Sequence, residues 1–411
     1  MKLLSLVIVL AVGGAAGAAQ AQAAASAPAP AGPSMRPETA PTLQATQKAL
    51  TERNYAEALN QLRLADAVPG KTPFELYLVE RLRFLAATGA RDLPLALKSV
   101  EAALAAEPFE PELRATLMDQ AANTAYALKD YERAVRWGQQ SLQAGITTPI
   151  ARLRLAQALY LQGQHPAAAQ VLDDLASRQR AAGEAPGEPQ LRLQASNLLK
   201  MKDEAGYARV LEALLASHPK PQIWADRLAR LQGQAGFDAR LVIDTLRMGQ
   251  RQGAWTDGEA LVELAELAVQ AGFVHEARSV LEAGYSAGLL GQGARAAAHQ
   301  ALRQRVQAQA TADLAAPVPD AQALAARDAN FGFATGWNLY TAGRTAEGLA
   351  LMQQAVQRGL PKYPDDGRLR LAMALAASGQ GTLARPLLVA VRDAGHRDGL
   401  SDLARLALLV P

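Results

Sequence analysis

The feature that most constrains this chain is a motif that recurs every 34 to 39 residues from Leu43 onward. Segment 121–142 aligns without gaps with segment 155–176, and both carry small residues, then a short polar turn, then a second apolar-periodic block. No window shows the alternation of β-branched and polar residues that strands need. The chain is therefore predicted to be all-α, a stack of repeated helix pairs.

A small residue early in each second helix gives the register of the repeat. Tyr207 is the one large residue at this position, and the next two intervals are about twice the repeat length. Weaker repeats are therefore expected near residues 221–252 and 292–328. The marker residues are Ala58, Ala96, Ala134, Ala168, Tyr207, Ala277, Gly348 and Ala384.

The small residues have a physical role, because alanine or glycine at a helix crossing lets two helices approach closely. Larger side chains above and below the crossing then interdigitate. One helix pair cannot bury its apolar face alone, so each pair must stack on the next and form a continuous core. This explains how a chain with only 5% aromatic residues can still be well packed.

The repeat resembles the tetratricopeptide repeat (TPR) superfamily over nearly all of the chain after Thr42. The resemblance implies a right-handed α-solenoid of about nine or ten helix pairs over residues 43–411, closed by a C-terminal capping helix. We place that capping helix at Ser401 to Val410, with Ser401 as its N-cap. The residues that match the small residue of the family's first helix are Ala122, Ala156, Ala265, Gly336 and Ala372, those that match its aromatic are Tyr55 and Tyr131, and those that match its closing proline are Pro108 and Pro219.

The N-terminus predicts export. Residues 1–23 have a positively charged start at Lys2, an apolar stretch and two small-x-small sites, as a secretory signal peptide does. An uncleaved membrane anchor is the alternative, and no later stretch is long and apolar enough to span a membrane. Residues 24–42 form a Pro/Ala-rich segment, which we expect to be a disordered linker. The protein is therefore expected in the periplasm.

Composition excludes several classes of function. The formal charge is +3 and no block of like charges occurs, which argues against nucleic-acid binding. The absence of cysteine removes disulfides and thiolate chemistry. The five histidines show no zinc-helix spacing, and Gly70-Lys71-Thr72 lacks the upstream glycine of a phosphate-binding loop. We predict neither a cofactor, nor a metal, nor an enzymatic activity.

The first candidate site is a partner-binding groove on the first helices of two repeats. Asp119, Asn123 and Tyr126 lie at i, i+4 and i+7, on a stripe turned away from the packed alanines. Gln157 and Tyr160 occupy the equivalent stripe of the next repeat. Amide and phenol groups beside apolar edges suit an extended peptide, and the resemblance implies that an asparagine at the place of Asn123 contacts peptide backbone.

The second candidate is the densest aromatic run of the chain. Phe333, Trp337 and Tyr340 again follow i, i+4 and i+7. If exposed, such a stripe would be a binding hot spot. The alternative is that these side chains seal the poorly matched repeat before them.

The combined hypothesis is a non-enzymatic periplasmic scaffold that binds a protein or peptide partner in an envelope complex. The resemblance to exported TPR proteins of Gram-negative bacteria implies TonB-type energy transduction, outer-membrane assembly or export as the process. The alternative is a glycan-binding structural component of a cell-wall or polysaccharide-export system. The sequence leaves the oligomeric state and the identity of the partner open.

Overall fold

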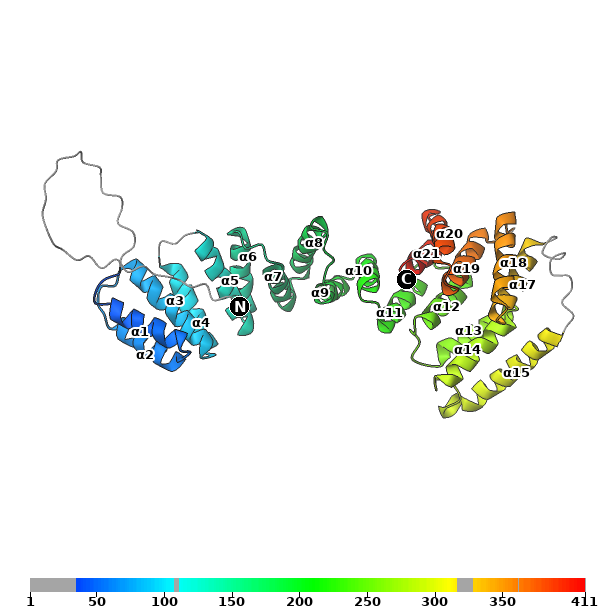
Figure 1. Cartoon of the computed structure of the whole chain (residues 1–411), viewed down its shortest axis with the longest axis horizontal. Helices are drawn as coiled ribbons and strands as arrows, with labels where there is room; N and C mark the ends of the chain where they lie inside the picture. The colour runs from blue at the N-terminus through cyan, green and yellow to red at the C-terminus, as the bar shows by residue number, and fades with distance from the viewer. Residues whose placement is uncertain (1–34, 107–110, 316–327, 361, 411) are drawn as a thin grey trace, which may run out of the picture. The chain divides into compact units, whose positions relative to one another are not determined.

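A computed structural model of the chain describes residues 35–106, 111–315, 328–360 and 362–410. Within these ranges it contains twenty α-helices and two short 3-10 helices, and no strand (Figure 1). The helices fall into two compact units, residues 1–128 and 129–411. The expected signal peptide and the first part of the expected linker lie outside the described residues.

The first unit contains five helices. Their bounds are α1 (Ala40–Thr51), α2 (Tyr55–Asp66), α3 (Pro73–Gly89), α4 (Leu93–Ala105) and α5 (Pro111–Ala127). Helix α1 begins three residues before Leu43, so residues 40–42 are helical and the prediction that they belong to a linker is wrong. Pro41 lies in the first turn of α1, where its missing N–H costs no helical hydrogen bond.

The turn between α2 and α3 is built by Lys71, Thr72 and Glu75. The ammonium of Lys71 donates to the carbonyls of Ala65, Asp66 and Val68, at and just after the end of α2. Thr72 and Glu75 form a capping box at the start of α3. The sequence Gly70-Lys71-Thr72 is therefore an inter-helix turn and not part of a phosphate-binding loop.

Glu75 also anchors the segment before α1, and this makes the stability of the first unit sensitive to acid. Its carboxylate accepts the backbone N–H of Arg36 at 3.0 Å and the Arg36 guanidinium at 2.8 Å. Burial alone would raise the pKa of Glu75, but hydrogen bonds from Thr72 and Arg36 outweigh it and lower the pKa to about 2.

We expect this contribution to be complete above the ordinary glutamate pKa of 4.5 and to be lost as the pH falls toward 2, because the folded pKa is depressed. The thermal midpoint of wild type should therefore fall more steeply over this pH range than that of Glu75→Gln. Parallel curves for the two proteins would contradict the assignment.

The second unit contains the remaining helices. Their bounds are α6 (Tyr131–Gln143), α7 (Pro149–Leu161), α8 (His165–Ala181), α9 (Glu188–Lys200), α10 (Glu204–Ser217), α11 (Pro221–Gln232), η1 (Ala239–Leu241), α12 (Val242–Arg251), α13 (Glu259–Gln270), α14 (Val274–Ser286), η2 (Gly293–Arg295), α15 (Ala296–Ala315), α17 (Ala329–Thr341), α18 (Thr345–Arg358), α19 (Pro364–Ala377), α20 (Gly381–Asp393) and α21 (Leu400–Ala407). The weaker repeat expected near residues 221–252 is the pair α11 and α12. The second weaker repeat was expected near residues 292–328. The part of it that the structure describes contains η2 and α15.

The predicted register is confirmed by burial and by backbone conformation. Every alanine marker has at most 2% of its surface exposed, and Tyr207 and Gly348 are also buried. The residue five positions before each marker adopts a left-handed conformation that ends the first helix of the pair. These turn residues are Arg53, Arg91, Lys129, Gly163, Lys202, Gly272, Gly343 and Gly379.

Tyr207 shows how one repeat accommodates a large residue at the crossing. Its hydroxyl donates to Asp226 at 2.6 Å, and the guanidinium of Arg230 lies 4.3 Å from the centre of its ring. Burial, with the neighbouring carboxylate of Asp226, raises the pKa of Tyr207 to about 12. The ring therefore extends from α10 to α11 and joins two successive repeats.

A close helix crossing joins Gly336 on α17 to Gly348 on α18. A Cβ atom added at Gly348 would lie 2.4 Å from the backbone nitrogen of Tyr340 and 2.5 Å from the carbonyl oxygen of Gly336. Backbone atoms cannot move aside as a flexible side chain does. Glycine is therefore required at this crossing.

We expect Gly348→Ala to destabilise the second unit by about 1–3 kcal/mol through overpacking. Gly381→Ala is the matched control, because nothing lies within 4 Å of the added Cβ at that position. The midpoint of urea unfolding should fall for the first variant and stay within error for the second. Equal midpoints would contradict the close crossing.

The last repeats of the second unit close back onto α10–α12. We call the contacts between residues 212–251 and 366–405 the closure seam. Arg405 pairs with Glu212 at 2.8 Å, and the backbone N–H of Asp238 donates to the carbonyl of Asp398 at 3.0 Å. Figure 1 places α21 beside α11 and α12. This part of the stack therefore closes on itself, which the repeat pattern did not predict.

The capping helix α21 begins one residue earlier than predicted. Gly399 is the N-cap residue, with a φ of 99°, and Ser401 is not. The hydroxyl of Ser401 instead donates to the carbonyl of Val391 and accepts the N–H of His396, tying α21 to the end of α20. Helix α21 covers the final repeat as expected, and it also packs on α12.

Candidate functional site

The predicted groove residues lie on two helices that belong to different units. On α5, Asn123 is exposed, and Asp119 and Tyr126 are half-buried, while Ala122 and Ala125 face the core. On α7, Gln157 and Tyr160 are half-buried, and the Tyr160 ring contacts His165 edge-on. Each stripe therefore lies on the side away from the crossing alanines, as expected, and its partner binding stays a prediction.

The aromatic run on α17 is mainly a packing element. Phe333 is buried, and Trp337 has only 2% of its surface exposed. The indole N–H of Trp337 donates to Glu276 at 2.9 Å, and the guanidinium of Arg247 lies 4.4 Å from the centre of its ring. The expectation of an exposed aromatic stripe is therefore wrong for Phe333 and Trp337, because both help to close the interior of the second unit. Trp337 is therefore not an exposed platform on which a sugar ring could stack.

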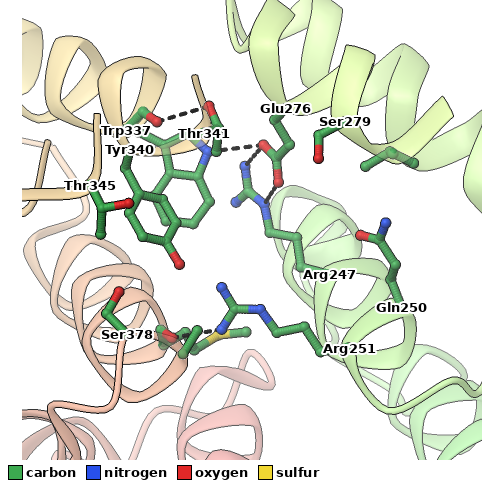
Figure 2. A pocket seen from close by; sticks show the side chains of 13 residues that line it. Arg247, Gln250, Arg251, Glu276, Ser279, Trp337, Tyr340, Thr341, Thr345 and Ser378 are labelled. Atoms are coloured by element: carbon green, nitrogen blue, oxygen red, sulfur yellow. Dashed lines mark hydrogen bonds and ion pairs between the residues drawn. The ribbon is translucent and has the colours of Figure 1, made fainter. Parts of the chain in front are cut away.

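Trp337 and Tyr340 instead line a cavity inside the second unit, which we call the inner pocket (Figure 2). Its volume is about 500 Å³, and it lies between α12, α14, α17, α18 and α19. Its walls are mainly polar, with arginine, amide and hydroxyl groups. The lining residues are Arg247, Gln250, Arg251, Glu276, Ser279, Val280, Trp337, Tyr340, Thr341, Thr345, Met373, Ala377 and Ser378.

One wall of the inner pocket is a buried ion network centred on Arg247. Its guanidinium makes two hydrogen bonds to Glu276, at 2.6 and 2.7 Å, and one to Asp244, at 2.8 Å. Burial alone would lower the pKa of Arg247, but these two carboxylates raise it and hold the charge in place. Asp244 also pairs with Arg370 of α19 at 2.8 Å, so the network links α12, α14 and α19.

Arg251 forms the opposite wall and differs from Arg247 in its partners. Its guanidinium points into the pocket toward Ser378 and Tyr340 (Figure 2) and donates to the carbonyl of Met373 at 2.6 Å. Among the described residues, no carboxylate forms an ion pair with Arg251. Packing of the surrounding walls lowers the pKa of Arg251, although the residue as a whole is exposed to solvent.

The charges around the inner pocket do not cancel. Among the residues that line it, Arg247 and Arg251 carry two positive charges and Glu276 carries one negative charge. The difference, 2 − 1, is one positive charge, and because Glu276 pairs with Arg247, this charge is placed on Arg251. A concave site concentrates this field because its walls have a low dielectric constant. The arrangement is suited to holding a single anionic group.

The inner pocket was missed by sequence reasoning because its residues come from five helices between positions 247 and 378. One signal was present in the sequence. Asp244 and Arg247 stand three residues apart within the apolar block of α12, where charged residues are rarely buried unless they are paired. In the described part of the chain, no cluster of three or more metal-ligating side chains is found. No helix there has the length and hydropathy of a membrane span.

Neither a protein-family model nor a curated protein sequence matches the chain. Solved structures to which the chain is similar include the apo form of RapI, with 10% identity, a TM-score of 0.37, and coverage of 77% of this chain and 86% of that chain. The TPR2AB domain of yeast Sti1 in its pHSP90 complex has 14% identity, a TM-score of 0.25, and coverage of 72% of this chain and 97% of that chain. The P58(IPK) TPR domain has 14% identity, a TM-score of 0.23, and coverage of 90% and 98%.

Proposed function

We propose that this chain is an exported, non-enzymatic scaffold that binds a protein or peptide partner of the cell envelope. The observation that carries the proposal is the polar stripe on α5. Asn123 is exposed beside Asp119 and Tyr126, whereas Ala122 and Ala125 of the same helix are buried. A helix that buries one face in the core can bind a partner through its opposite, exposed face.

The assignment as a non-enzyme is supported by the chemistry of the inner pocket. Glu276 is its one carboxylate, and both of its oxygens are taken by Arg247, with Trp337 as a further donor. General acid–base catalysis needs a titratable group within reach of a substrate. No such free carboxylate, and no histidine, lines the described pocket.

The periplasmic location is supported by the composition of residues 1–23. Fractionation of cells that produce the full chain tests this part of the proposal. We expect the protein in the periplasmic fraction, shortened at its N-terminus. Full-length protein in the cytoplasm would contradict it.

Partner binding is tested by site-specific photo-crosslinking in cells. A crosslinker at the exposed Ala127, at the end of α5, should capture a discrete partner. The Asn123→Ala/Tyr126→Ala variant should reduce that adduct. A crosslinker at Gln139, exposed on the second helix α6, serves as the control position. Equal adducts from both positions, or an adduct that the double variant leaves unchanged, would remove this stripe as the contact.

A further inference from the structure

We propose that the second unit binds a small amphiphilic carboxylate, with the carboxylate on Arg251 in the inner pocket and the apolar chain in an adjoining cavity. This goes beyond the scaffold function, which does not need such a ligand. The proposal rests on the position of Arg251, on the two cavities that meet there and on the excess positive charge of the pocket lining.

The adjoining cavity, which we call the apolar pocket, has a volume of about 300 Å³ and is lined mainly by apolar side chains. It lies between α12, α19, α20 and the C-terminal segment that contains α21. The lining residues are Met248, Arg251, Gln252, Met373, Ala376, Ala377, Leu388, Ala407 and Val410. Methionine and leucine side chains adapt their shape to an alkyl chain.

The two pockets share a wall. Arg251, Met373 and Ala377 line both of them. In the proposed complex, one molecule places its charged end in the polar cavity and its apolar end in the other, on the two sides of these shared residues. Both volumes lie in the range of small-molecule sites, which combine a mostly apolar surface with a few placed polar groups.

A carboxylate suits the polar end. The guanidinium of Arg251 can present two parallel N–H donors to its two oxygens. Because no described carboxylate pairs with Arg251, the ligand would displace none. The hydroxyl groups of Tyr340 and Thr345 lie at this end and can donate further hydrogen bonds, whereas the hydroxyl of Ser378 already donates to the carbonyl of Ala374.

An extended peptide suits the apolar pocket less well than an alkyl chain does. Bound peptides usually pair their backbone with free main-chain groups of a strand edge or a polar groove. The walls here are mostly helical, from α12, α19, α20 and α21, so most of their backbone groups already form hydrogen bonds within the helices. An alkyl chain has no polar groups and needs no hydrogen-bond partners in the pocket.

The test is calorimetric titration of the full-length protein with unbranched carboxylates from butanoate to octanoate. We expect the affinity to rise about fourfold with each added methylene, which is 0.8 kcal/mol converted to a ratio. Octanamide should bind about tenfold more weakly than octanoate, because the charged hydrogen bond is lost. Affinity that is independent of chain length would overturn the apolar pocket as the chain site.

Arg251→Gln should weaken octanoate binding about tenfold and leave octanamide binding unchanged. Arg305→Gln is the matched control, since Arg305 is exposed on α15, outside both pockets. Ala377→Phe, which fills the shared wall, should weaken octanoate and octanamide alike. Equal octanoate affinity for wild type and Arg251→Gln would overturn the proposal. So would a peptide with an apolar C-terminal residue that binds more tightly than octanoate and depends on Arg251 in the same way.

Discussion

Arg247→Met is expected to destabilise the second unit by about 3–5 kcal/mol, the largest effect of any single substitution considered for this chain. The side chain of Arg247 is almost fully buried, and it is the one group that neutralises Glu276 while also pairing with Asp244. Without Arg247, the buried carboxylate of Glu276 has no positive partner, and Asp244 keeps only Arg370. Methionine keeps most of the side-chain volume of arginine. The loss of stability should therefore come from the missing charge and not from poorer packing.

The readout is the midpoint of urea unfolding, followed by far-UV circular dichroism. Arg305→Met is the control, because Arg305 is exposed and substitutions at such positions usually change stability by less than about 0.5 kcal/mol. The double variant Arg247→Met/Glu276→Leu should recover part of the loss, since it removes one of the stranded charges. A single variant as stable as wild type would show that the network is absent in solution.

Arg240→Gln is expected to have the second largest effect, about 3 kcal/mol. Arg240 holds three carboxylates of the closure seam together, with distances of 3.0 Å to Asp366, 2.7 Å to Asp398 and 2.5 Å to Asp238. Without the guanidinium these three carboxylates repel one another. Burial already raises the pKa of Asp366, so the loss of Arg240 should raise it further.

The effect of Arg240→Gln should therefore depend on pH. Protonation of Asp366 relieves the repulsion, so the variant should lose less stability at low pH than at neutral pH. Arg397→Gln is the matched control, because Arg397 is an exposed arginine beside the same seam. The measurement is the difference in thermal midpoint from wild type at each pH. A difference that does not change with pH would contradict the role given to Asp366.

The fold was predictable where it depends on contacts between neighbours in the chain. The markers from Ala58 to Ala384 lie at crossings because close helix approach admits only small side chains, and the spacing of such residues is visible in the sequence. The turn five residues before each marker follows from the same register. Even Tyr207, which breaks the pattern, occupies the predicted place.

The inner pocket was not predictable, because it depends on contacts between residues more than a hundred positions apart. Arg370 meets Asp244 across 126 residues, and Arg251 meets Met373 across 122. Both arginines lie on helices whose local pattern is that of an ordinary repeat. Whether a stack of repeats stays open or closes depends on small rotations summed over many pairs. For the same reason, the sequence alone allowed two interpretations of the aromatic run at Trp337: an exposed binding stripe, or side chains that pack against the poorly matched repeat.

The central claim is that the last repeats close onto α10–α12, and a distance measurement across the closure seam tests it most directly. The chain has no cysteine, so Ala235→Cys/Arg397→Cys gives two unique sites for spin labels. Both residues are exposed, and they flank the point where Gly236 approaches the carbonyl of Arg397. Double electron–electron resonance should give one short, narrow distance, which broadens in urea. A long or broad distribution under native conditions would contradict the closed arrangement, and both pockets would lose their basis.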